Sequence, residues 1–252
     1  MRSATALAFC MGSSFRHRAT EREIIDDMTL DPADMDRVLS NLATINRFLG
    51  GYATTVRAFE KLVEPGNKVI RVLDVGAGGG DVARRLVEWG RANRRDVRIV
   101  TCDLSSAAAA FAAKSLAGLE GASVVQADVL ALPFREQSFD VVMCSLFAHH
   151  FPTPVVAQFL IAMHSISRRG VIVNDLHRHP LAFAGIWTLT RLLRASPIVR
   201  NDGPLSVRRA FVRDDLDELE RLTRLRFTVR WRWAFRWQVV IPRGARAESV
   251  DA

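Results

Sequence analysis

Four glycines and an acid follow an apolar run in the stretch VLDVGAGGGDVARRL. Gly76, Gly78 and Gly80 occupy alternate positions shortly after Asp74. Glycine lacks Cβ, so it adopts positive φ readily and lets a ligand lie against the main chain. In a parallel α/β sheet such a first turn is the usual ligand anchor. The dinucleotide fingerprint GxGxxG would need a glycine where the sequence has Asp81, so a pyrophosphate ligand is disfavoured.

Three histidines could remove a proton. His149 and His150 follow the apolar stretch from Phe139 to Ser145, and His177 follows the stretch from Val171 to Asp175. Histidine is the side chain best matched to proton transfer near neutral pH, so each is a candidate catalytic base. The alternative is that an imidazole caps or packs beneath the next helix.

A metal site is not expected from these residues. His149, His150, Asp175 and His177 could gather at one edge of a sheet, but no ligand spacing such as HxxxH connects them. The three cysteines are odd in number and far apart, without a CxxC pair, so neither a disulfide framework nor a zinc site is indicated.

The composition is that of one globular domain. The chain has 252 residues, of which 49% are hydrophobic and 25% charged. Its net charge of +8 could attract nucleic acid, an anionic membrane surface or an acidic substrate. The arginines are scattered, however, and where they are dense, from Arg221 to Arg236, they alternate with apolar residues as in a half-exposed strand. A solvated face is therefore favoured over a nucleic-acid partner.

The termini carry no clear targeting signal. MRSATALAFCMGSS has only a short apolar part and no small-residue cleavage pattern, so we interpret it as a leader and not as a secretory signal. No apolar run reaches about 18 residues, so no integral membrane segment is expected. A cytoplasmic location is predicted.

Helical and strand patterns alternate along most of the chain. Two helices are predicted first, within Asp31 to Gly51 and from Tyr52 to Val63. Five apolar strands follow, alternating with helical segments: Val69 to Val75, Val97 to Cys102, Ser123 to Ala127, Phe139 to Ser145 and Val171 to Asp175. Runs of Val and Ile without polar alternation predict strands covered on both faces, as in a doubly wound α/β sheet.

The last third of the chain departs from this alternation. An apolar segment from Leu181 to Leu193 precedes an arginine-flanked linker to Phe211, and this insertion is long enough for a substrate lid. The strands Phe227 to Trp233 and Trp237 to Ile241 are too close for a connecting helix, so they should pair antiparallel. We expect a leader at 1–20, a helical cap at 21–65, a main domain at 66–242 with its lid at about 178–211, and a tail at 243–252.

The spacing D-x-G-x-G-x-G from Asp74 to Gly80 resembles the first motif of class I S-adenosylmethionine (SAM) methyltransferases. The resemblance implies SAM as cofactor and a Rossmann-like seven-stranded sheet whose last strand is antiparallel. It also implies that the turn holds the methionine part, Asp103 the ribose, and Asp128 with Val129 the adenine. The cofactor-binding residues implied are Asp74, Gly76, Ala77, Gly78, Gly80, Asp103, Leu104, Asp128, Val129 and Ser145. For Asp103 a helix N-cap is the competing interpretation.

The methyl acceptor is expected to be a small molecule. The (N/D)PP(Y/F) tetrapeptide of amine methyltransferases is absent after the fourth strand, where the sequence reads SLFAHHF. The region from DLHRHPLAF to NDGPLSVRRAF resembles small-molecule methyltransferases of bacterial polyketide and quinone-type pathways. Apolar lid and cap residues suggest an aromatic or alkyl-bearing acceptor, unless they are ordinary core: Ile45, Phe48, Tyr52, Leu181, Phe183, Ile186, Trp187, Leu189 and Leu192. Arg208 or Arg209 could meet an acidic or phenolate group of the acceptor, but a surface position is favoured for each.

These observations predict a SAM-dependent O-methyltransferase with His149, His150 or His177 as general base. C-methylation of a similar acceptor remains an alternative, as does a SAM-binding regulator or scaffold without catalysis. A nucleic-acid methyltransferase is disfavoured.

Overall fold

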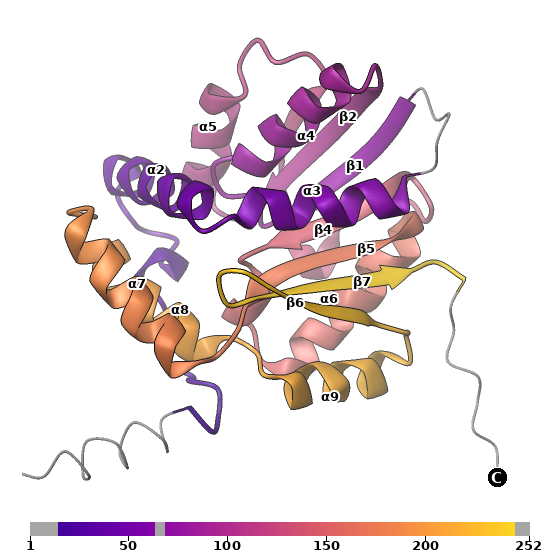
Figure 1. The fold of residues 1–252 in the computed structure, drawn as a ribbon. Helices are drawn as coiled ribbons and strands as arrows, with labels where there is room; N and C mark the ends of the chain where they lie inside the picture. Colours follow the sequence, from indigo (N-terminus) through magenta and orange to yellow (C-terminus); the bar gives the residue numbers. More distant parts are fainter. Residues whose placement is uncertain (1–14, 64–68, 245–252) are drawn as a thin grey trace, which may run out of the picture.

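The computed structural model describes residues 15–63 and 69–244. A seven-stranded sheet has the order β3-β2-β1-β4-β5-β7-β6 and lies between two layers of helices (Figure 1). Its strands are β1 Val69–Val75, β2 Asp96–Asp103, β3 Ala122–Gln126, β4 Phe139–Ser145, β5 Ser167–Leu176, β6 Thr228–Arg232 and β7 Arg236–Pro242. β1 to β5 are parallel, and β7 runs antiparallel to both of its neighbours. The predicted doubly wound sheet with an antiparallel last strand is confirmed.

Helices cover both faces of the sheet, as the unbroken apolar strands predict. One face packs against α6 Thr153–Ile166 and α9 Arg213–Thr223, and the other against α3 Gly51–Leu62 and α4 Asp81–Ala92. α5 Ser106–Ser115 lies beside β2 and β3. No helix among the described residues is long and apolar enough to cross a membrane.

A cap lies over the end of the sheet where the glycine turn follows β1. It consists of the 3-10 helix η1 Ile24–Asp26, α2 Pro32–Phe48, α7 Pro180–Leu192 and α8 Pro197–Arg209. Aliphatic side chains of α2, α7 and α8 form its core, among them Val38, Ile45, Ile186, Leu189 and Val199. The sequence therefore places α2 and α7 correctly.

The segment expected as a linker after the apolar lid is instead the helix α8. Its Asn201-Asp202-Gly203-Pro204 run is typical of a turn, and Pro204 lacks the N–H of a regular helical bond. Three contacts offset this loss: Ser196 caps the helix, α7 packs along it, and the carboxylate of Asp202 accepts the N–H groups of Ile24 and Ile25. The helix is thus stabilised by tertiary contacts that local sequence does not show.

A buried arginine joins the cap to the sheet. Arg236 of β7 is fully enclosed, and its guanidinium donates to Oδ1 of Asn46 at 2.9 Å and to Oδ1 of Asn174 at 3.5 Å. Burial lowers the pKa of Arg236 to about 10, partly offset by the charge of Asp175. Gly51 permits this arrangement, because a Cβ there would lie 1.6 Å from Oδ1 of Asn46 and 3.0 Å from Cζ of Arg236.

We expect Gly51→Ala to lower the free energy of unfolding by about 1 to 3 kcal/mol, because the added methyl displaces Asn46 and leaves the buried guanidinium short of an acceptor. Gly185→Ala in α7 is the matched control. Nothing lies within 4 Å of a Cβ at that position, so alanine should be neutral or stabilising. Urea unfolding of both variants measures the difference, and equal stabilities would contradict the role given to Gly51.

Candidate active site

The glycine turn has the backbone that its sequence predicts. Gly76, Gly78 and Gly80 all have positive φ, at 63°, 50° and 72°. The N–H groups of Gly76 and Ala77 donate to the carbonyl oxygen of Cys102, so the turn is fastened to the end of β2. The turn therefore sits between the carboxyl ends of β1 and β2.

Side chains lie directly over this turn. A Cβ on Gly76 would be 2.0 Å from the ring of Phe147, and one on Gly78 would be 3.2 Å from Leu39 of α2. Gly80 has a packing reason for its lack of a side chain, since a Cβ there would lie 2.8 Å from Leu116. A ligand that lies on the main chain at Gly76 thus requires the Phe147 ring to move.

Asp103 points at the turn. Its Oδ2 accepts the N–H of Gly78 and its Oδ1 accepts the N–H of Ser105, both at 3.0 Å. Ser105 itself is the N-cap of α5, so capping does not account for Asp103. Burial raises the pKa of Asp103, while the two N–H groups and the nearby charge of His150 lower it, and the net shift is upward. The carboxylate is held at the ligand side of the turn, where the resemblance places the ribose acid.

Asp74, at the end of β1, is enclosed without a donor for one oxygen. It is 1% exposed, and its Oδ2 has no hydrogen-bond partner. Burial raises its pKa well above the usual range, and the charges of Asp81 and Asp103 raise it further. A cation placed at the turn would stabilise the ionised form of this buried carboxyl group.

The remaining predicted cofactor residues lie at neighbouring strand ends. Asp128 follows β3 and accepts the N–H of Leu130 at 2.9 Å, which caps the 3-10 helix η2 Val129–Ala131. Leu104 is exposed and Val129 is buried. The Ser145 hydroxyl, at the end of β4, lies 3.2 Å from that of Thr55 in α3.

His149 is buried between two carboxylates. Its Nδ1 lies 2.7 Å from Oδ1 of Asp175, and its Nε2 lies 3.6 Å from Oε1 of Glu23. The main-chain N–H of His149 donates to the other oxygen of Asp175 at 3.2 Å. Burial raises the pKa of Asp175, but the contacts with His149 outweigh it and the net shift is downward.

The ring of His150 packs against that of His149, tilted by 34°, but remains partly accessible. The ring centroids are 4.3 Å apart, and the side chain of His150 is 16% exposed against 3% for His149. Nδ1 of His150 lies 2.7 Å from Oδ1 of Asp26, and among the described residues its Nε2 has no hydrogen-bond partner. Burial raises the pKa of Asp26, and the contact with His150 more than offsets this. A donor-acceptor pair of this kind fixes which imidazole nitrogen carries the proton.

Glu23 and two arginines complete the cluster, and the sequence analysis did not identify them. Oε1 of Glu23 has no hydrogen-bond partner, and burial raises the pKa of Glu23 to about 7. Arg209 is buried, with its Nε 3.7 Å from that oxygen, so the surface position expected for it is wrong. Arg209 also donates to the carbonyl oxygens of His149 and His150.

Arg18 reaches the same loop from the N-terminal side, although the prediction placed it in the leader. Its guanidinium donates to the carbonyl oxygens of His149, Phe151 and Arg209 at 3.0, 2.9 and 2.7 Å. The loop that carries His149 and His150 is thus held by guanidinium groups from the N-terminal segment and from α8. Residues 1–14 and 245–252, most of the expected leader and tail, lie outside the described residues.

His177 lies in a different environment. Its Nδ1 accepts the indole N–H of Trp231 at 3.2 Å, and its ring packs 4.9 Å from that of Trp237. Burial lowers the pKa of His177, and the neighbouring His179 and Arg178 lower it further. The structure therefore brings Asp175 to His149 and leaves His177 in an aromatic cluster at the β6–β7 hairpin.

A different set of residues could hold a cation. Ligand atoms of Glu23, His149 and His150 lie within 4.8 Å of one another. The guanidinium of Arg209 beside Glu23 already supplies positive charge there, which lowers the attraction for a metal ion. We therefore interpret this set as a proton-transfer cluster.

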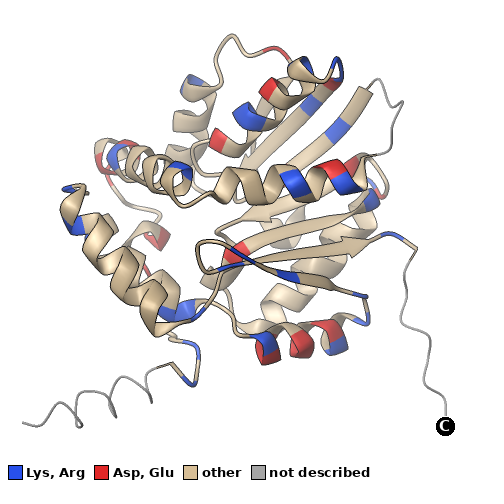
Figure 2. Cartoon of the chain, viewed as in Figure 1, with Lys and Arg blue, Asp and Glu red and all other residues tan. Residues whose placement is uncertain are grey.

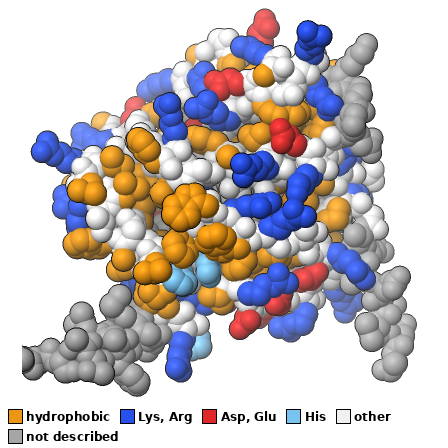
Figure 3. All heavy atoms as spheres, viewed as in Figure 1, with side chains coloured by type: hydrophobic (Ala, Val, Ile, Leu, Met, Phe, Trp, Pro, Cys, Tyr) orange, Lys and Arg blue, Asp and Glu red, His pale blue; other side chains and the backbone are white. Residues whose placement is uncertain are grey.

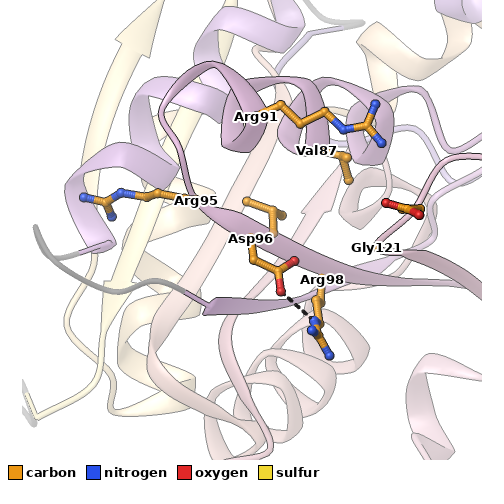
Figure 4. Close-up of a pocket in the computed structure, with 8 residues that line it drawn as sticks. Val87, Arg91, Arg95, Asp96, Arg98 and Gly121 are labelled. Atoms are coloured by element: carbon orange, nitrogen blue, oxygen red, sulfur yellow. Dashed lines mark hydrogen bonds and ion pairs between the residues drawn. The ribbon is translucent and has the colours of Figure 1, made fainter.

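A separate cavity of about 540 Å³ lies at the amino-terminal ends of the strands, where β2 begins (Figure 4). Its polar lining includes the ion pair of Asp96 with Arg98 at 2.9 Å, and Arg91 from the end of α4. Because ligands of parallel sheets bind at the carboxyl ends of the strands, this cavity is not the expected cofactor site.

Comparisons with known proteins agree with the fold and the turn. Residues 72–170 match the protein family described as "Methyltransferase domain". A SAM-dependent methyltransferase from Aquifex aeolicus is 13% identical with a TM-score of 0.60, covering 85% of this chain and 99% of its own. Human N-acetylserotonin methyltransferase in complex with SAM is 14% identical with a TM-score of 0.63, covering 97% of this chain and 68% of its own. No curated protein sequence matches significantly.

The CurJ carbon methyltransferase is also similar, at 15% identity and a TM-score of 0.59, covering 86% of this chain and 62% of its own. Residues 72–170 thus match a methyltransferase domain, and the chain has the fold of class I SAM-dependent methyltransferases. The family match and the fold agree with the class and the cofactor that the glycine turn predicts.

Stability should depend on pH through Glu23. Its carboxyl group binds a proton more tightly in the folded state, with a pKa of about 7, than at its ordinary value of 4.5. The contribution of Glu23 to the free energy of unfolding is fully present below pH 4.5 and is lost as the pH rises through 7. Relative to Glu23→Gln, the wild type should lose about 3 kcal/mol of unfolding free energy over that window. Urea unfolding at several pH values measures this, and a constant difference would contradict the buried position of Glu23.

Proposed function

We propose that the protein transfers a methyl group to the hydroxyl of an aromatic or polyketide-like small molecule, with His150 as general base. The observation that carries this proposal is the pair of adjacent imidazoles, each with Nδ1 held by its own carboxylate, at the carboxyl ends of the strands. Bound SAM supplies a methyl group on a positively charged sulfur, which is already electrophilic. The protein then needs to orient the acceptor, exclude water and remove a proton.

The residues around the turn fit SAM. Gly76 and Gly78 offer main chain without a Cβ to a ligand once the Phe147 ring moves, and each oxygen of Asp103 has a further lone pair for a ribose hydroxyl. The donor-free Oδ2 of Asp74 suits the cationic methionine portion. Asp128, Val129, Leu104, Ala77 and Ser145 keep the roles that the resemblance implies. Gly80 supports the turn through its packing against α5.

His150 is better placed than His149 to meet an acceptor. A hydrogen on Nδ1, donated to Asp26, leaves the lone pair on Nε2 to accept a hydroxyl proton. Nε2 of His149, in contrast, faces Glu23 inside the protein.

His149 then acts as a positioning residue. Asp175 fixes its ring through Nδ1, and the ring in turn supports that of His150 at 4.3 Å. Arg18 and Arg209 hold the main chain of both histidines. We do not propose His177 as the base, because it lies among the aromatic side chains of the hairpin.

The cap supports an apolar acceptor. Ile186 and Leu189 of α7 pack with Val38 and Ile45 of α2, so the lid presents aliphatic side chains inward. The resemblance to polyketide- and quinone-type methyltransferases supports the same substrate class. Methylation at carbon of such a ring is the close alternative, and the likeness to a carbon methyltransferase concerns the fold alone.

One observation favours a second candidate, a SAM-binding protein without turnover. Phe147 and Leu39 cover the turn, and Glu23 covers His149. Retained affinity for SAM with no product from any phenol would support this candidate, whereas a product with one added methyl would exclude it.

Asp103→Ala should weaken SAM binding by about 100-fold, because two hydrogen bonds to a charged acceptor are lost. Asp96→Ala, at the opposite end of the same strand, is the matched control and should bind normally. Isothermal titration calorimetry with SAM measures both. Unchanged affinity in the folded Asp103 variant would refute the ribose assignment.

His150→Ala should lower turnover by about 10² to 10⁴-fold while SAM affinity stays unchanged, because only proton removal is lost. His177→Ala is the control and should keep turnover. A panel of hydroxylated aromatics with labelled SAM measures the rate, and NMR of the product shows whether the methyl is on oxygen or carbon. Full activity in the His150 variant would exclude it as the base.

A further inference from the structure

The outer side of α7 is apolar and uncovered. Of its thirteen residues only Thr190 is buried. Leu181 is 65% exposed, Trp187 46% and Leu192 75%, and Leu193 directly after the helix is 41% exposed. The sequence predicts Leu181, Trp187 and Leu192 among the residues that line the acceptor, but the structure exposes all three side chains. Their outward position needs another explanation.

The same apolar surface continues onto the β6–β7 hairpin and the end of α2. The ring of His179, the N-cap of α7, stacks on Phe235 of the hairpin at 4.9 Å. Trp233 at the hairpin tip is 71% exposed, and its carbonyl oxygen would lie 3.8 Å from a Cβ on Gly50, next to the exposed Phe48. Apolar side chains gather over this face in Figure 3. We define the α7–hairpin surface as Phe48, Leu181, Trp187, Leu192, Leu193 and Trp233.

The chain segments that carry α7 and the hairpin hold charges of one sign. The sequence contains no Asp or Glu between residues 176 and 201 or between 221 and 247. The guanidinium of Arg191 lies 3.7 Å from the centre of the Trp187 ring, and Arg47 and Arg194 are exposed beside Phe48 and Leu193. The ribbon of α7 in Figure 2 carries the colour of basic residues and none of the colour of acidic residues.

We propose that the α7–hairpin surface binds the headgroup layer of an anionic lipid membrane. Trp and Leu side chains enter the boundary between headgroups and acyl chains, while flanking arginines pair with lipid phosphates. With thirteen residues, α7 is about 20 Å long, shorter than the apolar core of a bilayer, so it lies in the membrane plane. A second copy of this chain fits less well, because two such surfaces would bring like charges together.

This inference goes beyond the proposed function and does not depend on it. The inner side of α7 packs in the cap core through Ile186 and Leu189. The helix would therefore hold the cap against the membrane while its inner side faces the predicted acceptor region.

Flotation with lipid vesicles tests the proposal. The full-length protein is mixed with vesicles of phosphatidylcholine alone or with added phosphatidylglycerol. We expect it to float only with the anionic vesicles. The double variant Trp187→Ser/Leu192→Ser should bind about 100-fold more weakly, and Ile161→Ser, an equally exposed apolar position on α6, should bind normally.

Charge variants separate the electrostatic part. Arg191→Gln with Arg194→Gln should weaken binding by about 30-fold, whereas Arg91→Gln on α4 should leave it unchanged. All substituted positions are partly or fully exposed, so circular dichroism and melting should match the wild type. Absence of flotation, or equal flotation with neutral vesicles and with the arginine variants, overturns the proposal. So does a dimer that Trp187→Ser dissociates, because the surface would then be covered by a second copy.

Discussion

The carboxyl ends of four neighbouring parallel strands meet at one edge of the sheet, and every feature of the site depends on this constraint. β1 ends in the glycine turn, β2 in Asp103, β4 in the histidine loop and β5 in Asp175. Residues that are about a hundred positions apart in the sequence are therefore neighbours in the structure, and no pattern in the sequence around either residue indicates this. The hydrogen bond from Gly78 to Asp103 and that from His149 to Asp175 each join two of these strand ends.

Burial of charge at this edge is costly unless each group has a partner. The N-terminal segment and α8 supply those partners: Glu23 and Asp26 face the histidines, while Arg18 and Arg209 hold the loop carbonyl oxygens. Glu23 lacks such a partner for one oxygen: its Oε1 accepts no hydrogen bond, and burial raises its pKa. The cluster thus combines two imidazoles with buried carboxyl and guanidinium groups at the carboxyl ends of the strands.

Most elements of the fold could be predicted because their signals are local. β1 and β4 begin and end at the predicted residues, and α2 begins at Pro32 as expected. α8 was missed because Gly203 and Pro204 indicate a turn, whereas its stability comes from α7 and from Asp202. Arg209 was misplaced for a related reason: an arginine in a polar run is usually exposed, and only its contacts with distant residues bury it.

By itself the sequence determined the alternation of strands and helices, the bare turn after β1 and the antiparallel closing strands, because hydrophobic period and glycine placement act over a few residues. Only the tertiary structure decided which histidine meets which carboxylate, and that Glu23, Arg18 and Arg209 join them. These contacts span separations such as 131 residues between Arg18 and His149, and no local pattern encodes them. The outward side of α7 was likewise decided by packing, since a uniformly apolar helix does not show from its sequence which side the core will cover.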